Sequence, residues 1–333
     1  MDYKSGLTRR AFTAGAAVSL MTAKARMANA AIGPLETTKL RFGLPVPGSS
    51  FLPIYVAAEK TWKASGLDIE MVSFRGDAEV AQALAAGSID VSCQSLDGLI
   101  NLILAEQPVI GFYAGFYQAD FAWAAQPAIK KWSDLKGKLL GVSTFGSLTD
   151  ELTRYVLIKN GLDPSRDVKI IQSGPAPGRM QALKSGRLDC AIMSPPDKWV
   201  AEESGMTMLG AQSIDVAPEW PKHAFLAPSK FLDANPNVIK AFLRAHVQSI
   251  RYARANPDEA ARILSAALKF PARYADKAYR EVIDGYNERG ELPVASMDVY
   301  WNILIEGGVV KTAIPKDRLI DRRFIETFDD WAP

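Results

Sequence analysis

Apolar residues along the chain follow an order of strand-like and helix-like segments that occurs twice. The stretch 66–95 opens with Gly-Leu-Asp, runs through the apolar segment Ile69 to Phe74, and reaches Gln-Ala-Leu-x-x-Gly-x-Ile-Asp before it ends at Ser95. The stretch 161–194 repeats this order, with the apolar segment Val168 to Ile171 and Gln-Ala-Leu-x-x-Gly-x-Leu-Asp. A repeat of this kind indicates two structural units of like design.

The repeat extends upstream of both stretches. In each unit a strand pattern, Lys39 to Leu44 or Leu139 to Val142, precedes a polar loop and a helix that a glycine ends, Gly66 or Gly161. Strands that alternate with helices require crossover connections and favour parallel pairing. We therefore predict an α/β protein of two open lobes with largely parallel sheets.

The last third of the chain predicts a return to the first lobe. Ala224 to Ala227 has a strand pattern, so that a hinge of two strands would join the lobes. Val238 to Ala255 is amphipathic with helical period, and Asn256-Pro257-Asp258-Glu259 has the N-cap signature of a further helix. The predicted organisation is a signal peptide over 1–30, a first lobe over 31–121, a second lobe over 122–222, and the return with C-terminal helices over 223–333.

The first thirty residues have the features of an export signal. A basic start precedes a short apolar run, and Ala28-Asn29-Ala30 has the small residues of a cleavage site, which predicts cleavage after Ala30. Thr8-Arg9-Arg10-Ala11-Phe12 is typical of the twin-arginine route, although a general secretory signal that happens to hold two arginines has the same outline. We expect an exported, periplasmic protein.

Charge and cysteine content narrow the function classes. The first thirty residues hold five basic residues and one acidic residue, which leaves 34 basic and 36 acidic residues and a net charge of −2. This balance offers no basic field for nucleic acid, so no such partner is expected. Cys93 and Cys190 fall in strands of different lobes, which predicts two buried free thiols rather than a disulfide.

The predicted strand ends name the candidate ligand-binding loops. In open α/β sheets, ligands bind beyond the carboxyl ends of the strands. Three of the five loops at these ends are expected to lead into helices, whose free N–H groups favour anionic or electron-rich groups. The candidate ligand-binding residues are Ser49, Ser50, Phe51, Arg75, Gly76, Gln94, Ser95, Thr144, Phe145, Gly146, Ser147 and Ser194.

Each candidate also has a purely structural interpretation. Ser50, Thr144 and Ser147 would be N-caps worth about 1 kcal/mol each. Arg75 is the only basic residue in these loops and therefore the predicted counter-ion of an acidic ligand, or else a solvated side chain. Aromatic residues near the loops either fill the core or stack on a ring of the ligand; they are Phe51, Phe116, Tyr117, Phe145 and Trp199.

Sequence signatures of catalysis are absent. The chain has no Gly-x-Ser-x-Gly elbow, no Walker loop and no Gly-x-Gly-x-x-Gly after a strand, and we expect no cofactor. With His223 and His246 as the only histidines, a histidine-rich metal site is excluded. His246 lies on an amphipathic helix and is predicted to be structural, whereas His223 is predicted at the hinge.

Several motifs together resemble one family. Phe51 to Lys60, FLPIYVAAEK, is similar to the P-x-Y-V-A-x-E opening of periplasmic solute-binding proteins of the alkanesulfonate, taurine, nitrate and thiamine-precursor (NMT1/THI5-like) group. Asp134 to Lys138, Ala255 to Ala260 and both Gln-Ala-Leu segments resemble the same group. The resemblance implies a type II periplasmic-binding-protein fold and a monomer that presents a small solute to an inner-membrane ABC permease. The cysteine-rich motif of the pyrimidine-synthesising members is missing.

Two other functions are compatible with the sequence. An exported enzyme on the same fold would need an acid and a base in the cleft, and the available groups are Asp77, Asp197 and His223. A ligand-binding partner of a membrane sensor would have the same sequence features. The favoured ligand is a small anionic or aromatic solute, such as a sulfonate, a carboxylate or a pyrimidine, with Arg75 as its first candidate contact.

Overall fold

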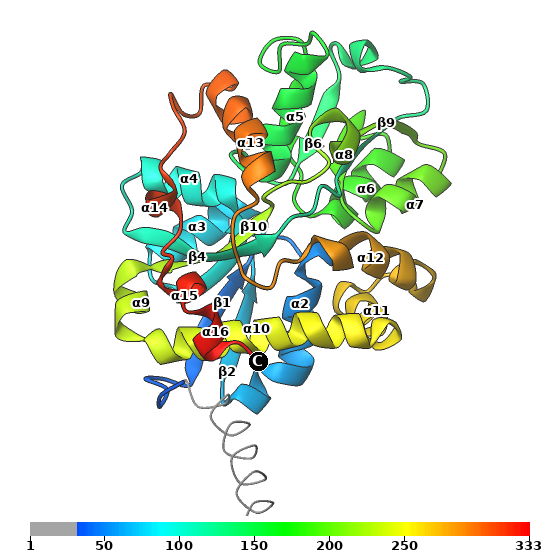
Figure 1. The fold of residues 1–333 in the computed structure, drawn as a ribbon. Helices are drawn as coiled ribbons and strands as arrows, with labels where there is room; N and C mark the ends of the chain where they lie inside the picture. Colours follow the sequence, from blue (N-terminus) through cyan, green and yellow to red (C-terminus); the bar gives the residue numbers. More distant parts are fainter. Residues whose placement is uncertain (1–31) are drawn as a thin grey trace, which may run out of the picture.

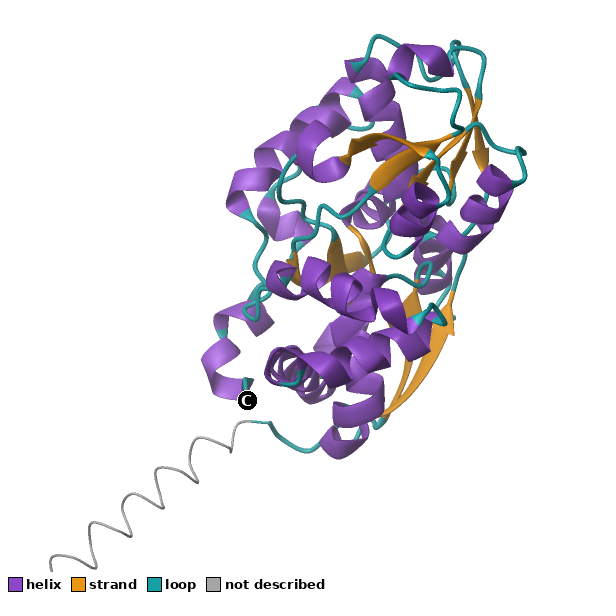
Figure 2. Ribbon diagram, turned by 90° about the vertical axis from the view of Figure 1, so that its right-hand side faces the viewer, coloured by secondary structure: helices purple, strands orange, loops and turns teal. Residues whose placement is uncertain are grey.

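The computed structural model describes residues 32–333, so the predicted signal peptide and its cleavage site lie outside the described residues. Within this range the strands form two sheets of five, and Figure 2 shows them as separate groups with helices on their faces. The strands are β1 (Lys39–Leu44), β2 (Asp68–Ser73), β3 (Val91–Ser95), β4 (Val109–Phe116), β5 (Ala122–Ala125), β6 (Leu139–Val142), β7 (Lys169–Gln172), β8 (Cys190–Met193), β9 (Thr207–Ala211) and β10 (His223–Pro228).

The helices cover both faces of each sheet. In Figure 1 the first lobe lies below and the second lobe above, with α5, α6, α7 and α8 on the second. The α-helices are α2 (Leu52–Val56), α3 (Asp77–Ala85), α4 (Leu96–Leu104), α5 (Leu148–Lys159), α6 (Ala176–Lys184), α7 (Asp197–Glu203), α8 (Gln212–Asp215), α9 (Ser229–Ala234), α10 (Pro236–Ala255), α11 (Pro257–Leu268), α12 (Ala275–Val282), α13 (Val294–Glu306), α14 (Lys316–Leu319), α15 (Arg323–Glu326) and α16 (Phe328–Trp331).

The two sheets have the same topology. Their strand orders are β2-β1-β3-β10-β4 and β7-β6-β8-β5-β9. In each sheet the first three strands pair in parallel, whereas the fourth strand is antiparallel to both of its neighbours. The sheets are therefore mixed: four strands of each sheet run in one direction, as expected of a largely parallel sheet, and one strand, β10 or β5, runs against them. The reason is that β10 and β5 enter their sheets directly from the other lobe and need no crossover helix.

The repeated sequence gives repeated structure. Asp90 and Asp189, which end the two Gln-Ala-Leu segments, each accept a hydrogen bond from the main chain of the neighbouring strand. Arg41 N lies 2.8 Å from Asp90 Oδ2, and Leu139 N lies 2.9 Å from Asp189 Oδ2. The two aspartates thus tie β3 to β1 and β8 to β6 and have a structural role in both lobes.

Aromatic packing and the two thiols lie in the interior. Phe42, Phe225 and Phe242 pack together between the first sheet and α10, with ring centroids 5.0–6.0 Å apart. Cys93 in β3 and Cys190 in β8 are both free and buried, as predicted. None of the helices within residues 32–333 is long and apolar enough to span a bilayer.

The chain crosses between the lobes twice, and the two crossings are tied together. One crossing follows β4 and the other precedes β10, where Lys222 N donates to Phe116 O at 2.9 Å. The Lys222 ammonium also forms an ion pair with the Asp120 carboxylate, and both side chains are almost fully buried. A buried pair of this kind holds the crossings in register, because neither charge is tolerated there without the other.

Candidate functional site

The loops at the carboxyl ends of the two sheets face each other and are in contact. Ser49 Oγ, at the start of the first lobe's α2 region, donates to Pro195 O of the second lobe at 3.1 Å. Asn101 Nδ2 on α4 donates to Gly146 O at 3.1 Å. These hydrogen bonds join residues that are far apart in sequence, so they hold the lobes in a closed arrangement.

Gly76 of the first lobe lies directly against the Thr144 side chain of the second lobe. A Cβ atom placed on this glycine would lie 2.3 Å from Thr144 Oγ1 and 2.9 Å from Thr144 Cγ2. The φ of Gly76 is 171°, an extended value that any residue can adopt. The glycine is therefore needed for the approach of the second lobe rather than for its own conformation.

Charged side chains join the lobes at a second contact zone, between α7 and the C-terminal helices. Lys198 on α7 forms an ion pair with Glu281 on α12. Glu203 accepts a hydrogen bond from the Tyr274 hydroxyl and lies 3.4 Å from Arg273 Nη2. Burial raises the pKa of Glu281, and the charge of Lys198 opposes this shift.

A small cavity lies between the lobes at the first contact zone. Its volume is about 40 Å³. Its walls come from three places: Pro45, Val46, Pro47, Gly48, Ser50, Phe51 and Asp77 in the first lobe; Ser143, Leu148, Thr149, Arg179 and Ser194 in the second; and Phe121, Lys222 and His223 at the crossings. The cavity therefore lies where open α/β sheets bind ligands.

Arg179 is the buried cation of the second-lobe wall. Its side chain reaches the cavity from α6, with a residue exposure of 1%. Arg179 Nε donates to Ile192 O at 2.8 Å, and Nη1 donates to Gly174 O. Burial lowers the pKa of the guanidinium to about 10, so that it remains charged at neutral pH. Two main-chain carbonyls thus hold the positively charged guanidinium group of Arg179 in place, and this group has five N–H donors.

Asp77 is the buried acid of the first-lobe wall. It is the first residue of α3, and its Oδ1 accepts a hydrogen bond from Ser95 N at 2.8 Å. Burial raises its pKa, while the hydrogen bonds from Ser95 and the charge of Lys222 act in the opposite direction. The second lobe therefore presents a basic group and the first lobe an acidic group to one cavity.

The wall near the crossings is aromatic. The His223 ring lies on Phe51, with centroids 4.5 Å apart and planes tilted by 35°. Burial lowers the pKa of His223 well below its ordinary value, so its imidazole is neutral. His223 Nδ1 is buried and has no hydrogen-bond partner among the described residues. His246, by contrast, packs among Tyr113, Phe116 and Phe225, as expected of a structural histidine.

Hydroxyl groups form the remaining polar wall, at the beginning of α5. Ser143 Oγ lies 2.9 Å from Ser147 Oγ and 2.8 Å from Thr149 Oγ1, and Ser143 N donates to Thr149 Oγ1 at 2.9 Å. Ser147 occupies the N-cap position but makes no side-chain capping hydrogen bond. The three hydroxyls can reorient toward a ligand, because each is both donor and acceptor.

The structure brings three of the predicted binding residues into the cavity wall, namely Ser50, Phe51 and Ser194. Others shape the contact between the lobes: Ser49, Gly76, Thr144 and Gly146 are described above. Ser147 belongs to the hydroxyl cluster beside the cavity. All five predicted loops lead into helices, two more than expected.

Gln94, Ser95 and Phe145 have other roles. Gln94 Nε2 donates to Ser92 Oγ at 2.9 Å within the first lobe. Ser95 Oγ accepts from Gly98 N at 3.3 Å and caps α4, which is the structural interpretation. Phe145 is exposed, and its main-chain N–H donates to Gln172.

Arg75 lies at the surface and does not line this cavity. Its side chain is 79% exposed and pairs at 2.6 Å with Glu79 of α3, the helix that follows. Sequence reasoning missed Arg179 because it considered cations only in the strand-end loops, whereas Arg179 lies inside a helix. A signal was present: the buried positions of α6 are Ala176, Arg179, Met180 and Leu183, so that an arginine occupies an otherwise apolar helical face.

The groups that an enzyme would need are only partly brought together. Asp77 and His223 line the cavity, whereas Asp197 begins α7 and does not. Neutral His223 has lost most of its basicity through burial. Within residues 32–333 no cluster of histidine, cysteine and carboxylate side chains has the arrangement of a metal site.

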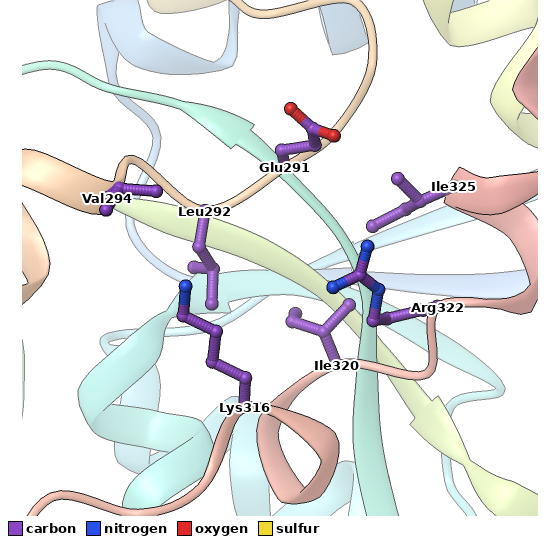
Figure 3. A pocket seen from close by; sticks show the side chains of 7 residues that line it. All are labelled: Glu291, Leu292, Val294, Lys316, Ile320, Arg322 and Ile325. Carbon is purple, nitrogen blue, oxygen red and sulfur yellow. The ribbon is translucent and has the colours of Figure 1, made fainter.

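A larger groove lies elsewhere on the surface. Its volume is about 180 Å³, and Figure 3 shows Leu292 and Ile320 lying between Lys316 and Arg322. All of its lining residues come from the segments 291–294 and 316–325. A ligand there would touch nothing in the second lobe, so this groove lacks the geometry of an interlobe site.

Sequence comparisons find relatives that align with most of this chain. YtlA of Bacillus subtilis, whose name describes a binding protein, is 24% identical over 87% of this chain and 89% of its own. The 4-amino-5-hydroxymethyl-2-methylpyrimidine phosphate synthase of Candida albicans is 25% identical over 68% of this chain and 70% of its own.

Two solved structures superpose on most of the chain. A protein of Bordetella bronchiseptica has a TM-score of 0.76 at 24% identity and covers 88% of this chain and 98% of its own. The periplasmic aliphatic sulphonate binding protein SsuA of Escherichia coli has a TM-score of 0.63 at 19% identity and covers 86% and 92%. These likenesses establish the periplasmic-binding-protein fold. The profile of the family described as NMT1/THI5 like matches residues 49–260, and the chain belongs to that family.

Proposed function

We propose that this protein binds a small organic anion between its two lobes and delivers it to an ABC permease of the inner membrane. The observation that carries the proposal is the buried Arg179 guanidinium in a cavity at the carboxyl ends of both sheets. Membership of the NMT1/THI5-like family supports the binding role. The likeness in fold to SsuA, a sulphonate binding protein, is consistent with an anionic solute.

Closure of the lobes is the step that couples binding to delivery. A ligand shifts an open–closed equilibrium only when it binds the closed form more tightly. A solute that contacts Arg179 and the first-lobe wall together satisfies this condition. Because Arg179 is buried in the closed form, the lobes separate to admit the solute.

The setting of the function is part of the proposal. The protein is exported to the periplasm, where it acts as a monomer. A twin-arginine signal predicts that replacing both Arg9 and Arg10 with lysine blocks export, whereas a general secretory signal would tolerate the change. Light scattering of the mature protein measures the oligomeric state.

A thermal-shift screen of the mature protein tests the proposal. Aliphatic sulfonates, aromatic carboxylates and pyrimidines form the panel. A solute at a hundredfold excess over its dissociation constant adds about 2.7 kcal/mol of stability, which raises the melting temperature by a few degrees.

Two matched variants identify the anchor. Arg179→Met removes the buried charge, and the expected result is that the melting shift disappears. Arg75→Met removes a cation from an exposed side chain that does not line the cavity, and it should keep the full shift. Failure of every anion to shift the wild type, or equal shifts in both variants, would refute the proposed site.

A further inference from the structure

The proposed anion site contains a buried carboxylate that an anion alone does not use. Asp77 lines the same cavity as Arg179 but belongs to the opposite lobe. A buried acid beside an anion site is unfavourable unless something compensates it. The presence of Asp77 therefore indicates that the solute has a second polar group, away from its anionic group, that compensates this acid.

The repeat shows that neither charge is required by the fold. The helices α3 and α6 begin at equivalent positions of the two units, which places Asp77 opposite Ala176 and Arg179 opposite Val80. Ala176 and Val80 are buried apolar residues. Each unit thus builds the same helix with an apolar residue where the other unit has a charge. The charges are additions to a scaffold that folds without them.

The protein itself does not neutralise Asp77 with Arg179. Within residues 32–333 the Arg179 and Asp77 side chains form no ion pair with each other. Lys222 also lines the cavity, but its ammonium is paired with Asp120 at the crossings. The cavity therefore receives a basic group from the second lobe and an acidic group from the first that do not pair with each other; the charge of Asp197 acts on Arg179, and the charge of Lys222 acts on Asp77.

Closure gives a reason for this arrangement. An anion on Arg179 alone would contact one charged group of the second lobe and none of the first. A solute with an ammonium group at its other end would contact both lobes by charge and would bind the closed form far better than the open form. Val46, Phe51 and Leu148 provide an apolar wall for the carbon chain between the two ends.

We propose that Asp77 is the specificity-determining residue of this site and that the solute is a small zwitterion, with its anionic group on Arg179 and its ammonium group on Asp77. This inference rests on the proposed function and narrows it to one class of solute. A simple inorganic anion or an unsubstituted alkanesulfonate would leave Asp77 without a partner in the closed form.

Matched pairs of probes test the inference by titration calorimetry on the mature protein. 2-Aminoethanesulfonate is compared with ethanesulfonate, and 3-aminopropanoate with propanoate, since each pair differs only in the ammonium group. We expect the amino member to bind at least tenfold more tightly in at least one pair.

Substitution of Asp77 should abolish that discrimination. Asp77→Asn keeps an oxygen that accepts the hydrogen bond from Ser95 N, and Asp77→Ala installs the residue of the second unit, so that the two variants guard against a fold defect. In both, the amino member should lose at least tenfold in affinity, while its unsubstituted partner binds as well as before or better. Asp97→Asn changes a buried acid that does not line the cavity and should leave the discrimination intact.

Three results would overturn the inference while leaving the proposed function standing. They are equal binding of both members of each pair, tight binding only of anions without an ammonium group, and an equal loss for both members in the Asp77 variants. Absence of binding for every anion, substituted or not, would instead refute the proposed function itself.

Discussion

At the scale of single residues, the site is defined by charges that the fold buries at a cost. An arginine with 1% exposure loses nearly all of its hydration. Hydrogen bonds from Arg179 to two main-chain carbonyls recover part of this cost. Val80 occupies the equivalent position of the first unit, so the same helix folds with a buried apolar residue there.

Replacing Arg179 should therefore separate stability from binding. We expect Arg179→Met to lower the free energy of unfolding by only about 1 kcal/mol, because the loss of the donor for two buried carbonyls is partly offset by the removal of a buried charge. Anion affinity should fall by roughly a hundredfold, as about 3 kcal/mol of charge-assisted hydrogen bonding is lost. Denaturant unfolding and calorimetry measure the two quantities. A large loss of stability together with intact binding would contradict this assignment.

Gly76 carries a second residue-scale prediction. Gly76→Ala should leave each lobe folded, because its backbone is extended, but should weaken solute binding about tenfold through the contact of the new Cβ with Thr144. The double variant with Thr144→Ala removes the opposing atoms and should restore the affinity. Failure of this rescue would show that closure does not depend on this contact.

The candidate residues show how far sequence reasoning reaches at this scale. Ser50, Phe51 and Ser194 were predictable because they follow strands whose ends the hydrophobic pattern marks. Arg179 and Lys222 were not found, because one lies inside a helix and the other in a crossing rather than in a strand-end loop. Exposure of Arg75 and its pairing with Glu79 depend on side-chain geometry, which no sequence pattern reports.

At the scale of elements, α4, α5 and α13 form a helical contact that spans the lobes. Asp97 on α4 is buried, and the Tyr300 hydroxyl of α13 donates to its Oδ1 at 3.4 Å. Burial raises the pKa of Asp97 to about 8, and the charges of Glu151 and Asp77 add to the shift. Burial also raises the pKa of Glu151 on α5 to about 7, with Asp150 adding to the shift and Arg154 opposing it.

These shifts predict that the closed, folded form is favoured at mildly acidic pH. An acid with a raised pKa in the folded form stabilises that form when protonated. The contribution is fully present below the ordinary pKa of about 4 and is lost as the pH rises through about 7 for Glu151 and about 8 for Asp97. Melting temperatures of the wild type should therefore fall between pH 5 and pH 9. Glu151→Gln should flatten this dependence, and an unchanged slope in that variant would contradict it.

Element boundaries were largely predictable. The strands β1 and β6 have the predicted bounds, and the helix α5 ends just before Gly161 as predicted, since alternation, turn residues and a terminal glycine mark them. The short strands β5 and β9 were missed. Ala122–Ala125 and Thr207–Ala211 have too few alternating positions to be distinguished from loops. They are strands because β5 pairs with β8 and β9 pairs with β5 at the edge of the sheet, which is a tertiary effect.

At the scale of the whole molecule, the lobes are joined by polar contacts and by a shared cluster of buried hydrophobic side chains. Ser49, Asn101 and Lys198 make hydrogen bonds or ion pairs from one lobe to the other. Each of these polar contacts is weak on its own, because a partly exposed pair contributes about 1 kcal/mol or less to stability. The repeat predicted two lobes, but the contacts between them depend on side chains from distant segments and were not predictable. An interface of this kind suits a hinge that a ligand closes.

Small-angle scattering of the mature protein, with and without a saturating solute from the screen, tests the central claim most directly. We predict that the solute lowers the radius of gyration of the wild type and of Arg75→Met, because an anion on Arg179 draws the lobes together. The radius of Arg179→Met should not change at the same solute concentration. A radius that stays constant in the wild type at saturation, or an equal decrease in Arg179→Met, would contradict the account.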